Sequence, residues 1–184
     1  MENLVAVAVE KNNICPHEIV VVTEVQPDFL PRATLAQAEG QMAILYSCEG
    51  LTPIGRCDDR AGGLTLDAIF ICLAGYIRCL LAARDMLLDT RLLSSDPETG
   101  VFVFRDPGGS EIVKAVWGAD TIADNRGKIC RVARSLAEHE RVIGAGISME
   151  RTMEIVRSEN LSLNACLKAV ECVHREWNHI VQGS

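Results

Sequence analysis

Residues 65–89 read TLDAIFICLAGYIRCLLAARDMLLD. Most of these side chains are apolar, and the charged residues Asp67, Arg78 and Asp85 recur at spacings that place them on one narrow stripe of a helix. Thr65 precedes the apolar run and has the side chain of a good N-cap. The pattern predicts a central helix over about 65–89 that is buried on most of its circumference.

A β-hairpin is predicted at 101–117. Two segments rich in β-branched and aromatic residues, 101–105 and 111–117, flank the turn Asp106-Pro107-Gly108-Gly109. Proline presets the backbone for a turn, and glycine accepts positive φ. The same kind of reading predicts further strands at 4–9, 19–25, 43–48 and 142–147, and helices at 28–41 and 120–139.

These elements predict an α+β protein. We expect a mixed sheet of about five or six strands with one tight β-hairpin, covered by the long central helix and by a C-terminal helical hairpin at 147–184. In that hairpin Ser148 and Ser162 are the expected N-caps of the two helices. The sequence contains no internal repeat or linker-like tract, so 1–184 is predicted to be one domain.

Composition narrows the classes of partner. Lys and Arg number 18 against 25 Asp and Glu, for a formal charge of −7, and only 4% of residues are aromatic. Neither value favours binding to nucleic acid or to an anionic membrane. The longest apolar run, 68–83, is shorter than the ~20 residues that span a bilayer, and the N-terminus lacks the pattern of a signal peptide. A soluble, cytoplasmic protein is therefore expected.

Two further expectations follow from residue usage. Apolar residues and glycine together exceed the usual share for a soluble domain, which predicts a homo-oligomer that hides the excess. The eight cysteines are expected to be reduced thiols, because a chain of this size needs no disulfides and shows no export signal. No Cys-x-x-Cys spacing occurs.

The loop at 48–63 is the first candidate for a functional site. It contains four glycines, lacks apolar periodicity and leads into the N-terminus of the central helix. Arg56 and Arg60 would contact an anionic ligand there, while Gly62 and Gly63 would let backbone amides approach it. This predicts a binding site for a carboxylate or a phosphate.

The same loop offers catalytic chemistry as an alternative. Cys57 could act as a nucleophile if the neighbouring arginines lowered its pKa, although Asp58 and Asp59 would oppose that effect. The two aspartates could instead serve as a general acid and base or as ligands of a divalent cation.

A metal site is a weaker alternative. Cys15 and His17 form a Cys-x-His pair on a predicted turn, and Cys48 and Cys57 could converge with them to hold zinc. The spacing of these four residues matches no known zinc signature.

Five cations gather around the predicted helix 120–139. Arg126, Lys128, Arg131, Arg134 and Arg141 make a local positive patch in an acidic chain, suited to an anionic ligand or an acidic partner. An exposed helix face with interleaved Glu138 and Glu140 explains the same pattern without a ligand.

Three functions are consistent with these patterns. The leading hypothesis is a cytoplasmic protein that binds a small anionic metabolite at 48–63, with regulation as one use of such binding. The second is a small enzyme that uses Cys57 or the Asp58–Asp59 pair. The third is a non-catalytic subunit of an oligomeric assembly, with the C-terminal helical hairpin as its partner surface.

Overall fold

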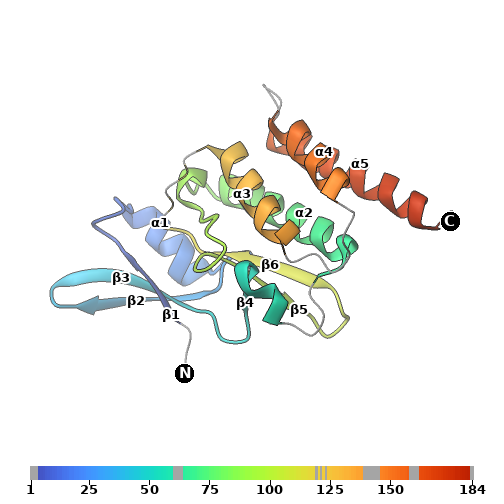
Figure 1. The fold of residues 1–184 in the computed structure, drawn as a ribbon. Coiled ribbons are helices and arrows are strands. Elements are labelled where there is room, and N and C mark those ends of the chain that lie inside the picture. The colour runs from blue at the N-terminus through green and yellow to red at the C-terminus, as the bar shows by residue number, and fades with distance from the viewer. Residues whose placement is uncertain are drawn as a thin grey trace.

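The computed structural model describes residues 4–59, 64–118, 120, 122, 124–138, 146–157 and 162–182. Within them, six strands form two antiparallel sheets of three strands each, and the long helices gather on one side of the second sheet (Figure 1). The predicted α+β class is confirmed, with two antiparallel sheets in place of the one mixed sheet of five or six strands that was expected. The strands are divided between two sheets because β1 and β4 each join a different hairpin.

The first sheet has the order β1-β3-β2, with β1 (Leu4–Ala8) at an edge, β3 (Gln41–Ser47) in the centre and β2 (Arg32–Ala38) at the other edge. The β2–β3 turn is made by Glu39 and Gly40, both with positive φ, as tight two-residue hairpins require. The strands expected at 4–9 and 43–48 are thus confirmed.

The helix expected at 28–41 is wrong, because this segment contains β2. Leu35 and Ala38 have helical spacing with Met42, but the turn at Gly40 instead pairs Leu35 with Ile44 across the sheet. Along β2, Ala33 is buried, whereas Leu35, two residues further on and therefore on the same face, is exposed. Cross-strand pairing outweighs the helical spacing.

The strand expected at 19–25 is also wrong. Residues 19 and 20 end helix α1 (Pro16–Val20), which continues into a π-helical turn, Val21–Val25. Pro16 occupies the first turn, and the Cys15 backbone N–H donates to the Glu18 carboxylate at 3.0 Å. These local start signals outweigh the β propensity of the valine-rich run.

The second sheet has the order β4-β5-β6. The predicted hairpin is confirmed as β5 (Val101–Arg105) and β6 (Glu111–Ala115), with the Gly109 N–H donating to the Asp106 carbonyl at 2.9 Å. Strand β4 (Thr52–Pro53) pairs with β5 and leads into a short 3-10 helix, Ile54–Asp59.

The central helix is confirmed as α2 (Leu66–Asp85), which packs against β6. The Thr65 hydroxyl accepts a hydrogen bond from the Ala68 N–H at 3.1 Å, as an N-cap should. The helix ends before Asp89, which caps a separate 3-10 turn, Thr90–Leu92. By length and hydropathy α2 could cross a membrane, but 61% of its most apolar window is buried, consistent with the core helix of a soluble protein.

Three more helices complete the layer over α2 (Figure 1). Helices α3 (Asn125–Glu138) and α5 (Leu163–Gln182) pack on α2, and α4 (Gly146–Arg157) packs on both of them. The Ser162 hydroxyl caps α5 as predicted. Of the strand expected at 142–147, residues 142–145 lie outside the described residues and the last two belong to α4.

Both sheets contribute to one buried cluster. The Tyr46 hydroxyl of β3 donates to the Trp117 carbonyl just after β6, and Gly118 abuts Val7 of β1. A Cβ on Gly118 would lie 2.3 Å from the Val7 side chain, so glycine is required for this approach. Trp117 and Gly118 are thereby held against the first sheet, shortly before α3 in the chain.

Candidate functional site

Helix α3 has two faces of different character. At 100° per residue, one face of the helix covers an arc of about 140°. It carries Arg126, Gly127, Cys130, Arg131 and Arg134. The opposite face is buried and carries Lys128, Ile129, Val132, Ala133 and Leu136. Cationic side chains therefore occur on both faces, but only one face is open to a ligand.

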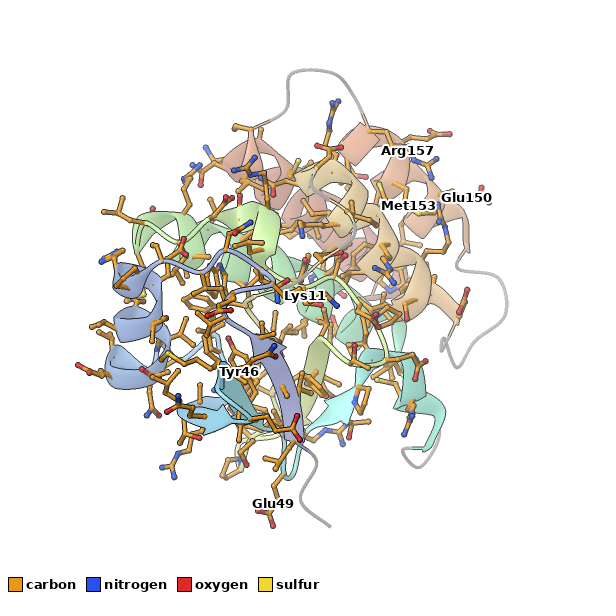
Figure 2. The ribbon with its side chains drawn as sticks, turned by 90° about the vertical axis from the view of Figure 1, so that its left-hand side faces the viewer. Lys11, Tyr46, Glu49, Glu150, Met153 and Arg157 are labelled. Atoms are coloured by element: carbon orange, nitrogen blue, oxygen red, sulfur yellow. The ribbon has the colours of Figure 1, made fainter. Side chains whose placement is uncertain are left out.

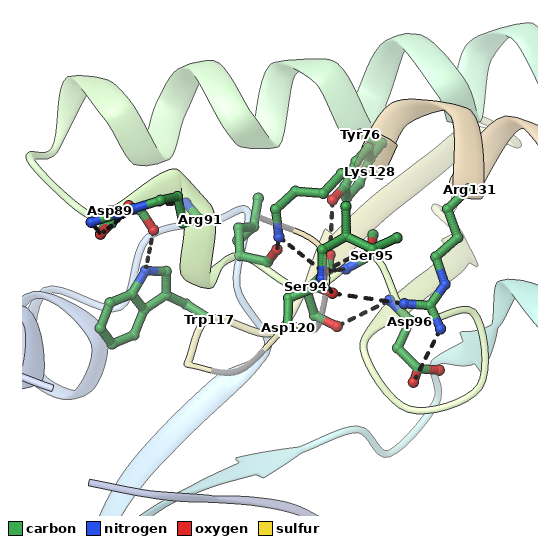
Figure 3. Close-up of polar contacts among 12 residues, drawn as sticks. Tyr76, Asp89, Arg91, Ser94, Ser95, Asp96, Trp117, Asp120, Lys128 and Arg131 are labelled. Atoms are coloured by element: carbon green, nitrogen blue, oxygen red, sulfur yellow. Dashed lines mark hydrogen bonds and ion pairs between the residues drawn. The ribbon is translucent and has the colours of Figure 1, made fainter. Parts of the chain in front are cut away.

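The buried face holds an ion pair that neither solvent nor ligand reaches (Figure 3). The Lys128 ammonium donates to the Leu93 carbonyl at 2.6 Å and to Oδ2 of Asp120 at 2.9 Å, and the two side chains are 0% and 1% exposed. Oδ2 of Asp120 also accepts from the N–H and the hydroxyl of Ser95, and Oδ1 accepts from the Ile122 N–H. The buried carboxylate is therefore fully hydrogen-bonded.

Burial and hydrogen bonding act in opposite directions on this pair. Burial alone would raise the pKa of the Asp120 carboxyl, but the hydrogen bonds from Ile122, Lys128 and Ser95 outweigh it and the pKa is lowered. Burial lowers the pKa of Lys128, and the attraction to Asp120 offsets only part of that effect. The pair ties α3 to the 93–95 segment and is structural.

The predicted cationic patch is corrected by this finding. Lys128 does not belong to the exposed patch, because Asp120 and the Leu93 carbonyl hold it inside the core. Arg141 lies outside the described residues. Arg126, Arg131 and Arg134 do share one face, as predicted, and helix α4 adds Arg157 to them.

These four arginines line one cavity of about 660 Å³ between α3 and α4. Arg157 lies on the last turn of α4 and is labelled in Figure 2. The remaining lining residues are Ile122, Asp124, Gly127 and Cys130. The described part of the lining thus carries four guanidinium groups against one carboxylate in a protein whose net charge is −7.

The described partners of Arg131, Arg134 and Arg157 are few and distant. Arg126 lies 3.9 Å from the Asp124 carboxylate, whose other role is to accept N–H groups of the first turn of α3. Arg131 lies 3.7 Å from both Asp96 and Asp120, beyond hydrogen-bond distance. No described residue forms an ion pair or a hydrogen bond with Arg134 or Arg157. The donor capacity of Arg134 and Arg157 is therefore unused among the described residues.

Arg131 also lines a second cavity of about 490 Å³ beside the edge strand β1. Its guanidinium stands between Asp96 and Asp120 (Figure 3). Lys11 lies on the other side, and the remaining polar residues are Asn12, Ser94 and Thr99. Charges of both signs meet here, so this cavity has no strong preference for anions.

The predicted ligand loop is only partly described. Arg56 is exposed and pairs with Glu98 at 3.2 Å, so a carboxylate of the chain itself already occupies its guanidinium. Arg60, Gly62 and Gly63 lie outside the described residues. The backbones of Asp58 and Asp59 close the 3-10 helix Ile54–Asp59, while their side chains are not described. Ligand binding at 48–63 stays a prediction.

Cys57, the predicted nucleophile, is fully buried, and its thiol lies 3.8 Å from the Pro53 carbonyl. In this conformation a substrate from solvent does not reach the sulfur. The eight cysteines are all free thiols, so no disulfide joins any of them. Six are buried, and burial raises the pKa of Cys48 to about 11 and of Cys79 to about 12.

The zinc ligands that the sequence suggested are not assembled. Cys15 and His17 are exposed on α1, whereas Cys48 is buried after β3. Among the described residues, no three side chains of His, Cys, Asp or Glu are grouped so as to hold a metal ion.

Comparisons with known proteins give no match: no family model fits the chain, and neither curated proteins nor solved structures are similar to it. Residue roles are therefore inferred from geometry and charge.

Two parts of this site were not predicted from the sequence. Arg157 lies 23 residues after Arg134, and only the packing of α4 on α3 brings it to the same cavity. Asp120 was expected inside a helix, but the helix begins at Asn125 and leaves the aspartate free to enter the core. A strict helical wheel would have placed Lys128 beside Val132 and thus on the buried face.

Proposed function

We propose that the protein binds a small anionic molecule in the cavity between α3 and α4, through Arg126, Arg131, Arg134 and Arg157. The observation that carries this proposal is the convergence of four arginines from two helices on one cavity. The class of ligand is the one that the sequence indicated, and the proposed position is a different one from the loop 48–63.

Electrostatics supports this position. Like charges on one helix face repel one another, and an acidic chain gains nothing in stability from adding Arg134 and Arg157 to them without a described partner. Guanidinium groups match carboxylate and phosphate oxygens with paired hydrogen bonds, each charge-assisted. An anion in the cavity would satisfy Arg134 and Arg157, which have no ion pair within the described residues.

The test is a titration with small anions. Inorganic diphosphate, sulfate and citrate would be titrated calorimetrically into the full chain at low ionic strength. At least one should bind, and Arg134→Gln with Arg157→Gln should weaken that binding at least tenfold, because a charge-assisted hydrogen bond is worth about 1.5–3 kcal/mol. Added salt should weaken binding as well.

A matched control removes two cations elsewhere. Lys168 and Arg175 are exposed on α5, two turns apart, and line none of the cavities described above. Lys168→Gln with Arg175→Gln lowers the net charge by the same amount and should leave the affinity within about twofold. Equal losses in the two double variants would show a general charge effect and would refute the assignment of the site.

Cytoplasmic location and self-association accompany this proposal as predictions. Size-exclusion chromatography with light scattering at tens of micromolar should give a multiple of 20.1 kDa. A monomer would contradict the predicted homo-oligomer and would leave the proposed anion site unaffected, since all its residues come from one chain.

A further inference from the structure

We infer that the ligand of the arginine cavity is a diphosphate group, free or at the end of a larger molecule, and that the site takes no part in recognising a base. This inference rests on the proposed function and narrows its ligand class. Three features of the cavity carry it: its charge, the spread of its arginines and the absence of aromatic residues from the part of its lining that the structure describes.

The charge of the lining indicates that the ligand carries more than one negative charge. Among the described lining residues, four guanidinium groups face a single carboxylate, that of Asp124. Asp96 and Asp120 approach Arg131 at 3.7 Å, which leaves Arg134 and Arg157 without a described partner. A singly charged anion would neutralise one of these two and leave the other facing a like charge. An anion with two or more charges can satisfy both.

The distance between the arginines along α3 indicates that the ligand has more than one anionic centre. Arg126 and Arg134 are eight residues apart on α3, which corresponds to about 12 Å along the helix axis. A single tetrahedral phosphate presents its oxygens at one level of that span. A diphosphate has two linked tetrahedral centres, so guanidinium groups at different levels can each form a pair of hydrogen bonds with it.

The rest of the lining offers little to an organic group. Ile122, Gly127 and Cys130 are the residues without charge, and none of the eight lining residues is aromatic. Nucleobase binding commonly uses stacking on aromatic side chains. The described lining lacks a stacking surface, so attaching a nucleoside to the diphosphate should add little affinity.

The experiment compares four probes on the full chain in metal-free buffer at low ionic strength: diphosphate, orthophosphate, ADP and citrate. We expect diphosphate to bind at least tenfold more tightly than orthophosphate, and ADP to bind within about threefold of diphosphate. Arg134→Gln with Arg157→Gln should weaken diphosphate and ADP alike. Lys168→Gln with Arg175→Gln is the control, and far-ultraviolet circular dichroism verifies folding.

The outcomes separate this inference from the proposed function. If orthophosphate or citrate binds as tightly as diphosphate, and the arginine variants weaken it, the anion site stands and the diphosphate inference is wrong. If ADP binds more than tenfold tighter than diphosphate, the site recognises a base and the inference is again wrong. If none of the four probes binds, both are refuted.

Discussion

The two faces of α3 carry the same kind of charge and use it in different ways. Lys128 is fully buried, with a carboxylate and a carbonyl as hydrogen-bond partners, whereas Arg134 is exposed and has no described partner. A buried charge with complete partners fixes the helix in place. A charge without partners, gathered with others around a cavity, is available to a ligand. The difference between the structural Lys128 and the proposed ligand-binding Arg134 therefore lies in their hydrogen-bond partners and not in their charge.

The largest expected loss of stability comes from breaking the buried ion pair between Lys128 and Asp120. Lys128→Met should destabilise the fold by about 3–5 kcal/mol, because it leaves the Asp120 carboxylate buried without its cation. Urea denaturation at pH 7 measures the change. In the Lys128→Met background, adding Asp120→Asn should cost nothing or restore stability, whereas Asp120→Asn alone should destabilise. Simple additivity would contradict the pairing.

The second-largest expected effect is a loss of stability at acidic pH. Hydrogen bonds hold the pKa of Asp120 below its ordinary value near 3.9, so the unfolded state takes up the proton first as the pH falls. This contribution to stability is complete above about pH 5 and is lost as the pH falls through the folded-state pKa. Denaturation series from pH 3 to 7 should give a shallower slope for Asp120→Asn. An unchanged slope would show that another group dominates.

Replacing Arg131 should have an intermediate effect on stability, since this residue is partly exposed and has only distant ion-pair partners. Its guanidinium is 3.7 Å from Asp96 and Asp120 and is about one-third exposed. Arg131→Gln should therefore destabilise by about 0.5–1 kcal/mol, well below the effect of Lys128→Met. Thermal unfolding of the two variants side by side tests this order. A larger loss for Arg131→Gln would reverse the assigned roles.

The smallest effect on stability belongs to Arg134 and Arg157. Neither has a described ion pair, so Arg134→Gln with Arg157→Gln should change the unfolding free energy by less than about 0.5 kcal/mol. A slight stabilisation is the favoured direction, because the change removes repulsion between like charges. A loss above 2 kcal/mol would mean that these arginines support the fold.

Elements with strong local signals were predictable from the sequence. Thr65 caps α2 as expected, and the Asp106–Gly109 turn forms the expected hairpin. The errors arose where local spacing competed with tertiary pairing: 28–41 has helical spacing but pairs with β3, and 19–25 is rich in valine but follows the capped turn at Pro16.

The site was predictable only in part for the same reason. Three arginines at helical spacing indicated one cationic face, and that part holds. The helical spacing of Lys128 with Val132 is compatible with its burial, but its partner Asp120 was expected inside the same helix. The place of Arg157 depends on how α4 packs on α3, a long-range contact that no short pattern encodes.

The most direct test of the different roles of the two faces is arginine labelling with phenylglyoxal, mapped by mass spectrometry with and without diphosphate. Arg134 and Arg157 should label readily in the free protein and be protected by diphosphate, while the exposed Arg175 on α5 should label equally in both samples. Equal labelling of all three with diphosphate present would contradict the assignment of the cavity as the ligand site.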